Sequence, residues 1–273
     1  MLHIQMRKVY LSLLFVFLFS ACHEKKYPYK LENKIIIGYI EDFNCSNWGT
    51  VHKAKDSLEK LDYASLPYLI ENLNSKDKYV KLKNTADLIY PGTKEFYGSG
   101  WVVDYDIDWL SIRTGWAIED ITFENFGFKE LKISEKELIE LQKSNIKYEE
   151  YLRTGNYGFD IKPDRIKAIK KCVEKANEWW EENYKNWNRL NGITAALKSN
   201  DTQRQSSALQ YLRFGEYCIA GLTRKYFDKE LRPIIENLLK SKEESIKQDS
   251  ELLLSTVDYK GDMEFYNITT KCW

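Results

Sequence analysis

Three aspartates at alternate positions, Asp104, Asp106 and Asp108, are the residues whose types and spacing most directly suggest chemistry. Oxygen ligands at alternate positions begin the loops that bind calcium. The rest of such a loop does not follow, because Trp109 stands where the turn requires glycine and Gly115 stands where a bidentate glutamate should close the site. We therefore predict that these aspartates bind no metal ion.

The same aspartates precede a predicted helix over 108–121 that carries tryptophans and an arginine. Asp106 or Asp108 is expected to cap this helix, since a carboxylate accepts hydrogen bonds from the unpaired amides of a first turn. Aromatic and arginine side chains also dominate the energetics of protein interfaces. We therefore identify six candidate partner-binding residues: Trp101, Asp104, Asp106, Trp109, Arg113 and Trp116. The alternative is that the tryptophans of this helix pack into the core.

Groups for nucleophilic catalysis are scarce in this chain. His52 is the only histidine outside the first 33 residues, and no Gly-x-Ser-x-Gly motif, P-loop or zinc motif occurs in the sequence. A pair of carboxylates, for example Asp108 with Glu119 or Glu124, would suit glycoside hydrolysis. Because the chain has 41 acidic residues, such pairs arise by chance. We expect no catalytic residue and no cofactor, and we keep a carboxylate-based envelope hydrolase as an alternative.

The elements that position these residues are predicted to be helices with a 3.6-residue apolar period. One short helix is expected to end near Tyr63 and a second to cover 65–74, since Pro67 is tolerated only where a helix begins or breaks. A long amphipathic helix is predicted to begin at Pro163 and Asp164, two residue types that suit a first turn. Its opposite face carries charges of both signs and is expected to face solvent.

Two stretches of the C-terminal third, 193–212 and 235–254, repeat each other at a step of 42 residues. The stretch 66–73 is similar to 231–238, with the proline shifted by one place. This pattern resembles the HEAT-type repeat, whose period is about 40 to 47 residues. The resemblance covers 56–122 and 192–255. It implies an all-α fold, an irregular HEAT-like α-solenoid of stacked helix pairs with short non-helical N- and C-terminal segments. An irregular helical bundle remains the alternative.

The N-terminal residues resemble the signal peptide of bacterial lipoproteins. Arg7 and Lys8 precede the apolar stretch 9–19, which is too short to span a bilayer as a permanent helix. The sequence Phe-Ser-Ala-Cys then ends at Cys22 and is similar to a lipobox. The resemblance implies cleavage before Cys22 and acylation of that residue, and His23 after it is compatible with delivery to the outer membrane.

These patterns divide the chain into successive segments. They are a signal peptide (1–21), a tether (22–33), an N-terminal HEAT-like part (34–130), a middle helical segment (131–191) and a C-terminal HEAT-like part (192–273). In the chain that begins at Cys22, 39 of the 41 basic residues remain beside 41 acidic residues, because Arg7 and Lys8 are removed. Such a nearly neutral chain argues against a nucleic-acid partner.

The cysteines beyond the lipidation site allow several pairings. Cys45, Cys172, Cys218 and Cys272 permit three complete disulfide patterns, and the sequence does not choose between them. We expect a protein of the bacterial cell envelope, lipid-anchored at Cys22, whose helical body binds a protein partner. A toxin-neutralising, immunity-type protein is one version, by analogy with helical-repeat lipoproteins. A structural envelope scaffold is a further alternative.

Overall fold

The computed structural model describes six stretches of the chain: 31–75, 79–90, 101–103, 105–131, 163–215 and 219–270. The chain divides into two units, Met1–Glu32 and Asn33–Trp273, and every element below lies in the second unit. The predicted signal peptide and lipidation site at Cys22 lie outside the described residues, as do Asp104, Cys218 and Cys272.

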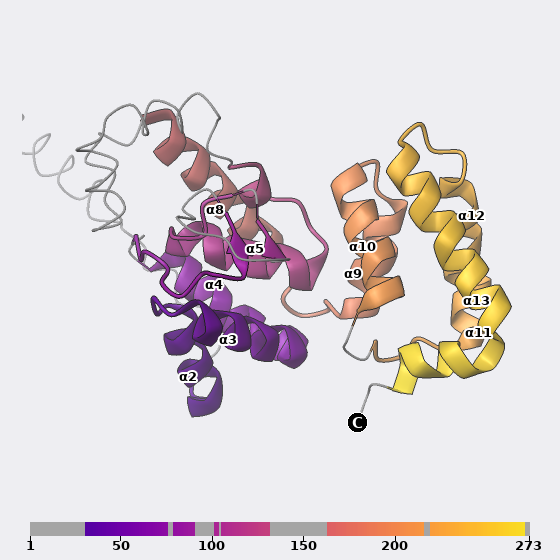
Figure 1. The fold of residues 1–273 in the computed structure, drawn as a ribbon, viewed down its shortest axis with the longest axis horizontal. Helices are drawn as coiled ribbons and strands as arrows, with labels where there is room; N and C mark the ends of the chain where they lie inside the picture. The colour runs from indigo at the N-terminus through magenta and orange to yellow at the C-terminus, as the bar shows by residue number, and fades with distance from the viewer. Residues whose placement is uncertain are drawn as a thin grey trace, which may run out of the picture. The chain divides into compact units, whose positions relative to one another are not determined.

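The fold of the described residues is all-α, as the sequence predicts (Figure 1). The N-terminal elements are α2 (Lys34–Phe43), α3 (Trp48–Leu61), η1 (Asp62–Ala64), α4 (Leu66–Asn74), α5 (Leu110–Thr122), η2 (Phe128–Glu130) and α8 (Pro163–Asn183). The C-terminal elements are α9 (Arg189–Lys198), α10 (Thr202–Phe214), α11 (Arg224–Tyr226), the π-helical turn η3 (Phe227–Leu231), α12 (Arg232–Leu238) and α13 (Glu244–Thr270). Two short strands, β1 (Leu88–Ile89) and β2 (Trp101–Val102), pair in parallel.

Local sequence signals set the ends of several helices. Asn33 caps α2, Asn47 caps α3, Asn188 caps α9 and Asp201 caps α10, each through a side-chain oxygen that accepts from first-turn amides. The predicted break near Tyr63 is confirmed, since the 3₁₀ turn η1 separates α3 from α4. Helix α9 begins a few residues before the predicted segment boundary at 191, and α13 continues well beyond the repeat pattern.

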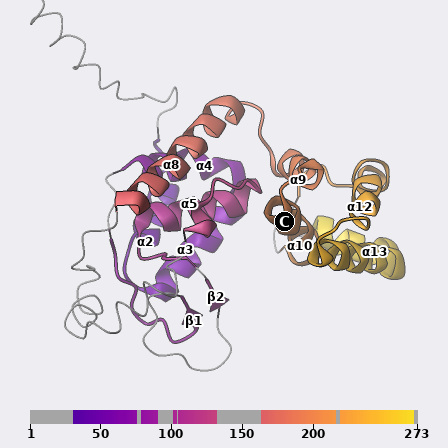
Figure 2. The ribbon, with the colours of Figure 1, turned by 90° about the horizontal axis from the view of Figure 1, so that it is seen from above.

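The N-terminal helices enclose one part of the core. Helix α4 buries Leu66, Leu69, Ile70 and Leu73, and it packs against α5 and α8 (Figure 2). Helix α5 is buried on nearly all sides, because α3, α4, α8, α9 and η2 all contact it. Within the described stretches, no helix combines the length and apolar character that crossing a bilayer requires.

The C-terminal helices share a second apolar cluster. Helix α9 pairs with α10, helix α12 pairs with α13, and α10 contacts α13 (Figure 1). These two pairs contain the stretches 193–212 and 235–254 that repeat in the sequence. Phe123, at the end of α5, is 2% exposed and belongs to this same cluster. That these helix pairs are HEAT-like repeat units, stacked as a solenoid, stays a prediction.

Candidate binding cleft

Asp108 connects the extended segment 79–90 to the start of α5. Its carboxylate accepts hydrogen bonds from the Leu82 amide at 2.8 Å, the Tyr79 hydroxyl at 3.0 Å and the Lys81 ammonium at 3.1 Å. The predicted cap of α5 is therefore wrong. The N-cap residue is Trp109, which makes no side-chain cap bond. Neither aspartate caps the helix, because the Asp108 carboxylate binds the segment 79–90 and the Asp106 carboxylate accepts from the Asp108 amide.

Arg113 is fully buried and binds the surrounding backbone through hydrogen bonds. Its guanidinium donates to four carbonyl oxygens: Ile107 and Phe43 at 2.8 Å, Cys45 at 3.0 Å and Val80 at 3.1 Å. Burial lowers the pKa of Arg113 to about 10, against the opposing effect of the Asp108 carboxylate. The side chain thus remains charged at neutral pH and holds together three segments that are far apart in the sequence.

Three of the four predicted partner-binding residues whose side chains the structure describes are buried. Asp106 and Arg113 are 0% exposed and Trp116 is 7% exposed. The prediction that these three residues bind a partner is therefore wrong, and their side chains instead pack inside the protein and position its backbone. Trp109 is half-buried and packs edge to face on Tyr79, with 5.2 Å between ring centroids. The side chain of Trp101 and all of Asp104 lie outside the described residues.

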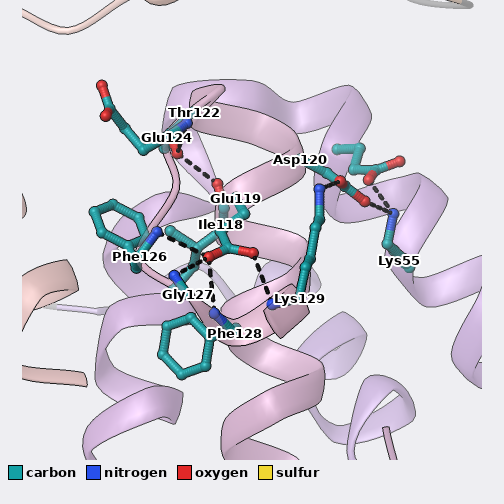
Figure 3. Close-up of polar contacts among 11 residues, drawn as sticks. Lys55, Ile118, Glu119, Asp120, Thr122, Glu124, Phe126, Gly127, Phe128 and Lys129 are labelled. Carbon is teal, nitrogen blue, oxygen red and sulfur yellow. Dashed lines mark hydrogen bonds and ion pairs between the residues drawn. The ribbon is translucent and has the colours of Figure 1, made fainter. Parts of the chain in front are cut away.

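Glu119, a member of the predicted hydrolase pair, is enclosed by the loop that follows α5. One carboxylate oxygen accepts from the amides of Phe126 and Gly127 at 2.9 Å and of Phe128 at 3.0 Å, and the other accepts from the Lys129 amide at 3.3 Å (Figure 3). Burial raises the pKa of Glu119, although the Lys129 ammonium and these amides oppose the shift. A carboxyl group so enclosed is not available to a substrate.

An open cleft of about 330 Å³ lies between two groups of elements that the sequence keeps far apart. One wall comes from α3, the end of α5 and η2, and it carries Lys55, Glu59, Asp120 and Lys129. The other wall comes from α9 and α10. We call this the charged cleft. None of these four charged residues was singled out from the sequence.

The charged wall is a network of ion pairs centred on Asp120 (Figure 3). The Lys55 ammonium lies 2.8 Å from one oxygen of Asp120, and the Lys129 ammonium lies 2.5 Å from the other. Lys55 also pairs with Glu59, one helical turn along α3. Its ammonium is 4.3 Å from the centroid of the Trp116 ring, so this tryptophan stabilises the Lys55 charge through a cation–π contact.

Burial and neighbouring charges shift the pKa values in this network. Burial alone would lower the pKa of Lys55, but the carboxylates of Asp120 and Glu59 raise it. Burial favours the protonated form of Asp120, yet Lys129 and Lys55 together hold its pKa below the ordinary value. Burial raises the pKa of Glu59, and Lys55 only partly offsets this.

The opposite wall presents aromatic side chains of α10. Tyr211 packs edge to face on Phe123, and its hydroxyl accepts a hydrogen bond of 2.6 Å from Arg189. Phe214, one turn further along, is 66% exposed although it is a large apolar residue. The sequence signal for this wall is the spacing of three and four residues between Ser207, Gln210, Tyr211 and Phe214, which places them along one side of α10.

Arg204 joins the two walls beside the cleft. Its guanidinium donates to the Phe123 carbonyl at 3.1 Å and to the Glu124 carboxylate at 2.6 Å. Asn125 adds a bond of 2.9 Å to the Asp201 carboxylate. Glu124, the other carboxylate of the predicted hydrolase pair, is thus bound in an ion pair, and burial still raises its pKa.

Neither metal-ligand groups nor disulfides define a site in the described ranges. No three His, Cys, Asp or Glu side chains there are grouped so that they could hold a metal ion. Cys45 and Cys172 are free thiols in this structure. Comparison with protein-family models, with curated proteins and with solved structures finds no match to this chain.

Proposed function

We propose that this chain is a lipid-anchored protein of the bacterial cell envelope whose helical body binds another protein through the charged cleft. The observation that carries the proposal is Phe214, which is 66% exposed at the edge of a cleft whose opposite wall is densely charged. An exposed aromatic residue beside partly desolvated charges is the chemistry of an interface hot spot. A toxin is one class of partner that such an immunity-type protein would neutralise.

The anchor part of the proposal rests on the lipobox-like sequence that ends at Cys22. Acyl chains contribute about 0.8 kcal/mol per buried methylene, and stable anchoring takes more than one such signal. Replacement Cys22→Ser is expected to move the protein from the membrane fraction to the soluble fraction. Retention of the variant in the membrane would overturn the anchor.

Photo-cross-linking in intact cells tests the binding part directly. A photoreactive phenylalanine analogue at position 214 of the anchored chain is expected to give a cross-linked species of defined mass. Leu252 on α13 is a matched control, since it is an apolar residue that is 48% exposed and does not line the cleft. Equal adducts at both positions, or no adduct at position 214 under any growth condition, would contradict a binding role for the cleft.

Hydrolysis of a glycan is the second candidate function. Glu59 and Asp120 line the same cleft, and their pKa values move apart, because burial raises that of Glu59 while Lys129 and Lys55 lower that of Asp120 against the effect of burial. One protonated and one ionised carboxyl group is the pair that glycoside hydrolases use. Both groups, however, bind the same Lys55 ammonium, so a sugar would have to compete with an ion pair at each carboxyl group. Loss of cell-wall glycan cleavage on Glu59→Gln would favour this alternative.

A further inference from the structure

Asp120 is the most exposed of the charged side chains that line the cleft. The Asp120 side chain is 27% exposed, whereas the Lys55 side chain is 9% exposed and the Arg189 side chain is 4% exposed. Lys55 lies against Trp116, and Arg189 lies against Tyr211. The Asp120 carboxylate is therefore more accessible from the cleft than either of the two buried cations.

Asp120 keeps hydrogen-bonding capacity in spite of its two ion pairs. Each of its oxygens contacts one ammonium group, Lys129 on one side and Lys55 on the other. An ionised carboxylate has about four acceptor positions, so each oxygen can accept from a further donor. Lys129 is the more exposed of the two lysines, at 19% against 9%. Because its stem is flexible, it is the group that can move aside for an incoming cation.

The aromatic wall suits a planar cation. In this structure the Arg189 guanidinium already lies 5.1 Å from the centre of the Tyr211 ring, and the Arg213 guanidinium lies 4.5 Å from that of the Phe214 ring. Guanidinium groups stack on aromatic faces and bind carboxylates with two parallel hydrogen bonds. The two walls together thus provide both partners that a guanidinium group uses.

We infer that the charged cleft receives an arginine side chain of a protein partner, with Asp120 as its acceptor and Phe214 against its apolar stem. The inference rests on the proposed protein-binding function and names the chemistry of the partner's contact. An acidic side chain would lie beside Glu59 and Asp120, and of the three cations that line the cleft Lys55 and Arg189 are nearly buried and Lys129 is already paired with Asp120. We therefore expect an acidic side chain to bind less tightly than arginine. The arginine competes with Lys129 for Asp120, so the affinity is set by the difference between the two ion pairs.

Titration of the full chain in detergent with blocked dipeptides tests this inference. The probes are N-acetyl-Leu-Arg-amide, its glutamine analogue and its glutamate analogue, with binding followed by ligand-observed NMR. The arginine probe is expected to bind about tenfold more tightly than the glutamine probe, a difference of about 1.4 kcal/mol. Higher salt should weaken it, because the contact is partly exposed. Equal affinities, or tighter binding of the glutamate probe, would overturn the inference.

Two variants with opposite expected effects separate recognition from general damage to the fold. Asp120→Asn removes the negative charge and replaces one of the two acceptor oxygens with an NH2 group, and it should weaken the arginine probe about tenfold. Lys129→Met removes the competing cation and should tighten it about threefold. Asp87→Asn, an exposed carboxylate that does not line the cleft, should leave binding unchanged. Weaker binding of the arginine probe to Lys129→Met would refute the competition on which the inference depends.

Failure of this inference can be distinguished from failure of the proposed function. If cross-linking at position 214 succeeds while the dipeptides show no preference for arginine, the cleft binds a partner by other chemistry and only the inference falls. If cross-linking fails and no dipeptide binds, both fall.

Discussion

Removal of the Glu119 carboxylate should destabilise the loop that joins α5 to η2. In Glu119→Ala, the buried amides of Phe126, Gly127 and Phe128 lose their acceptor. Each unsatisfied buried donor costs about 1–3 kcal/mol, and we expect about 3–5 kcal/mol in all because the loop relaxes and admits water. This is a large fraction of the free energy of unfolding of an ordinary domain, which is about 5–15 kcal/mol.

The matched variant Glu119→Gln separates hydrogen bonding from charge. Its side-chain oxygen can still accept from the three amides, and it removes a charge whose burial is unfavourable. In the native chain the second carboxylate oxygen accepts from the Lys129 amide at 3.3 Å. In the glutamine variant an NH2 group takes the place of that oxygen and cannot accept this bond. We expect a loss of about 1–2 kcal/mol for this variant, smaller than for alanine because most hydrogen bonds persist.

Urea-induced unfolding followed by tryptophan fluorescence measures both losses. Native-state hydrogen exchange provides a local readout, since protection of the amides of Phe126, Gly127 and Phe128 should fall selectively in Glu119→Ala. The reasoning is refuted if alanine costs less than about 0.5 kcal/mol, the range of an ordinary surface substitution. A glutamine variant as unstable as the alanine variant would also refute it, because charge rather than hydrogen bonding would then dominate.

Three further predictions follow from the same part of the structure. Arg113→Lys should lower the free energy of unfolding by about 2–4 kcal/mol in urea titrations, because one ammonium cannot serve four carbonyls. Gly115→Ala should lower it by about 1–3 kcal/mol, since the added Cβ would overlap the Phe128 ring; an unchanged melting temperature would contradict this contact. Burial raises the pKa of Glu119, so between the ordinary and the raised pKa the folded chain holds this proton more tightly than the unfolded chain. The contribution of Glu119 to stability should therefore fall as pH rises through that window, and unfolding from about pH 4 to pH 7 should lack this fall in Glu119→Gln.

The helices were predictable where a periodic apolar pattern met a clear boundary signal. Pro67 and the break near Tyr63 mark α4 correctly, and Pro163 marks the start of α8. The cap of α5 was not predictable in the same way. Asp108 stands near the helix start, as a cap residue would, but long-range partners at 79–90 compete for its carboxylate. Local capping rules do not include such partners.

The candidate site depends even more on contacts between residues that are far apart in the sequence. Spacing of four residues links Lys55 with Glu59, so that pair was visible in the sequence. Asp120 and Lys129 meet only because the chain turns back between them, with Gly127 at a φ of 100°. The aromatic wall of α10 comes to lie opposite these charged residues only when the chain folds. The tryptophan-rich segment suggested a partner surface, but its arginine and Asp106 are buried by contacts that the sequence does not reveal.

Phe123 has a consequence for how the chain unfolds. It follows the last residue of α5, yet its ring is packed within the apolar cluster of α9, α10, α12 and α13. Arg204 binds its carbonyl oxygen from α10. Separation of the N-terminal from the C-terminal helices would therefore expose an aromatic ring on one piece and leave a hole in the core of the other. The helical body is thus expected to melt in a single cooperative transition, and neither half is a self-sufficient folding unit.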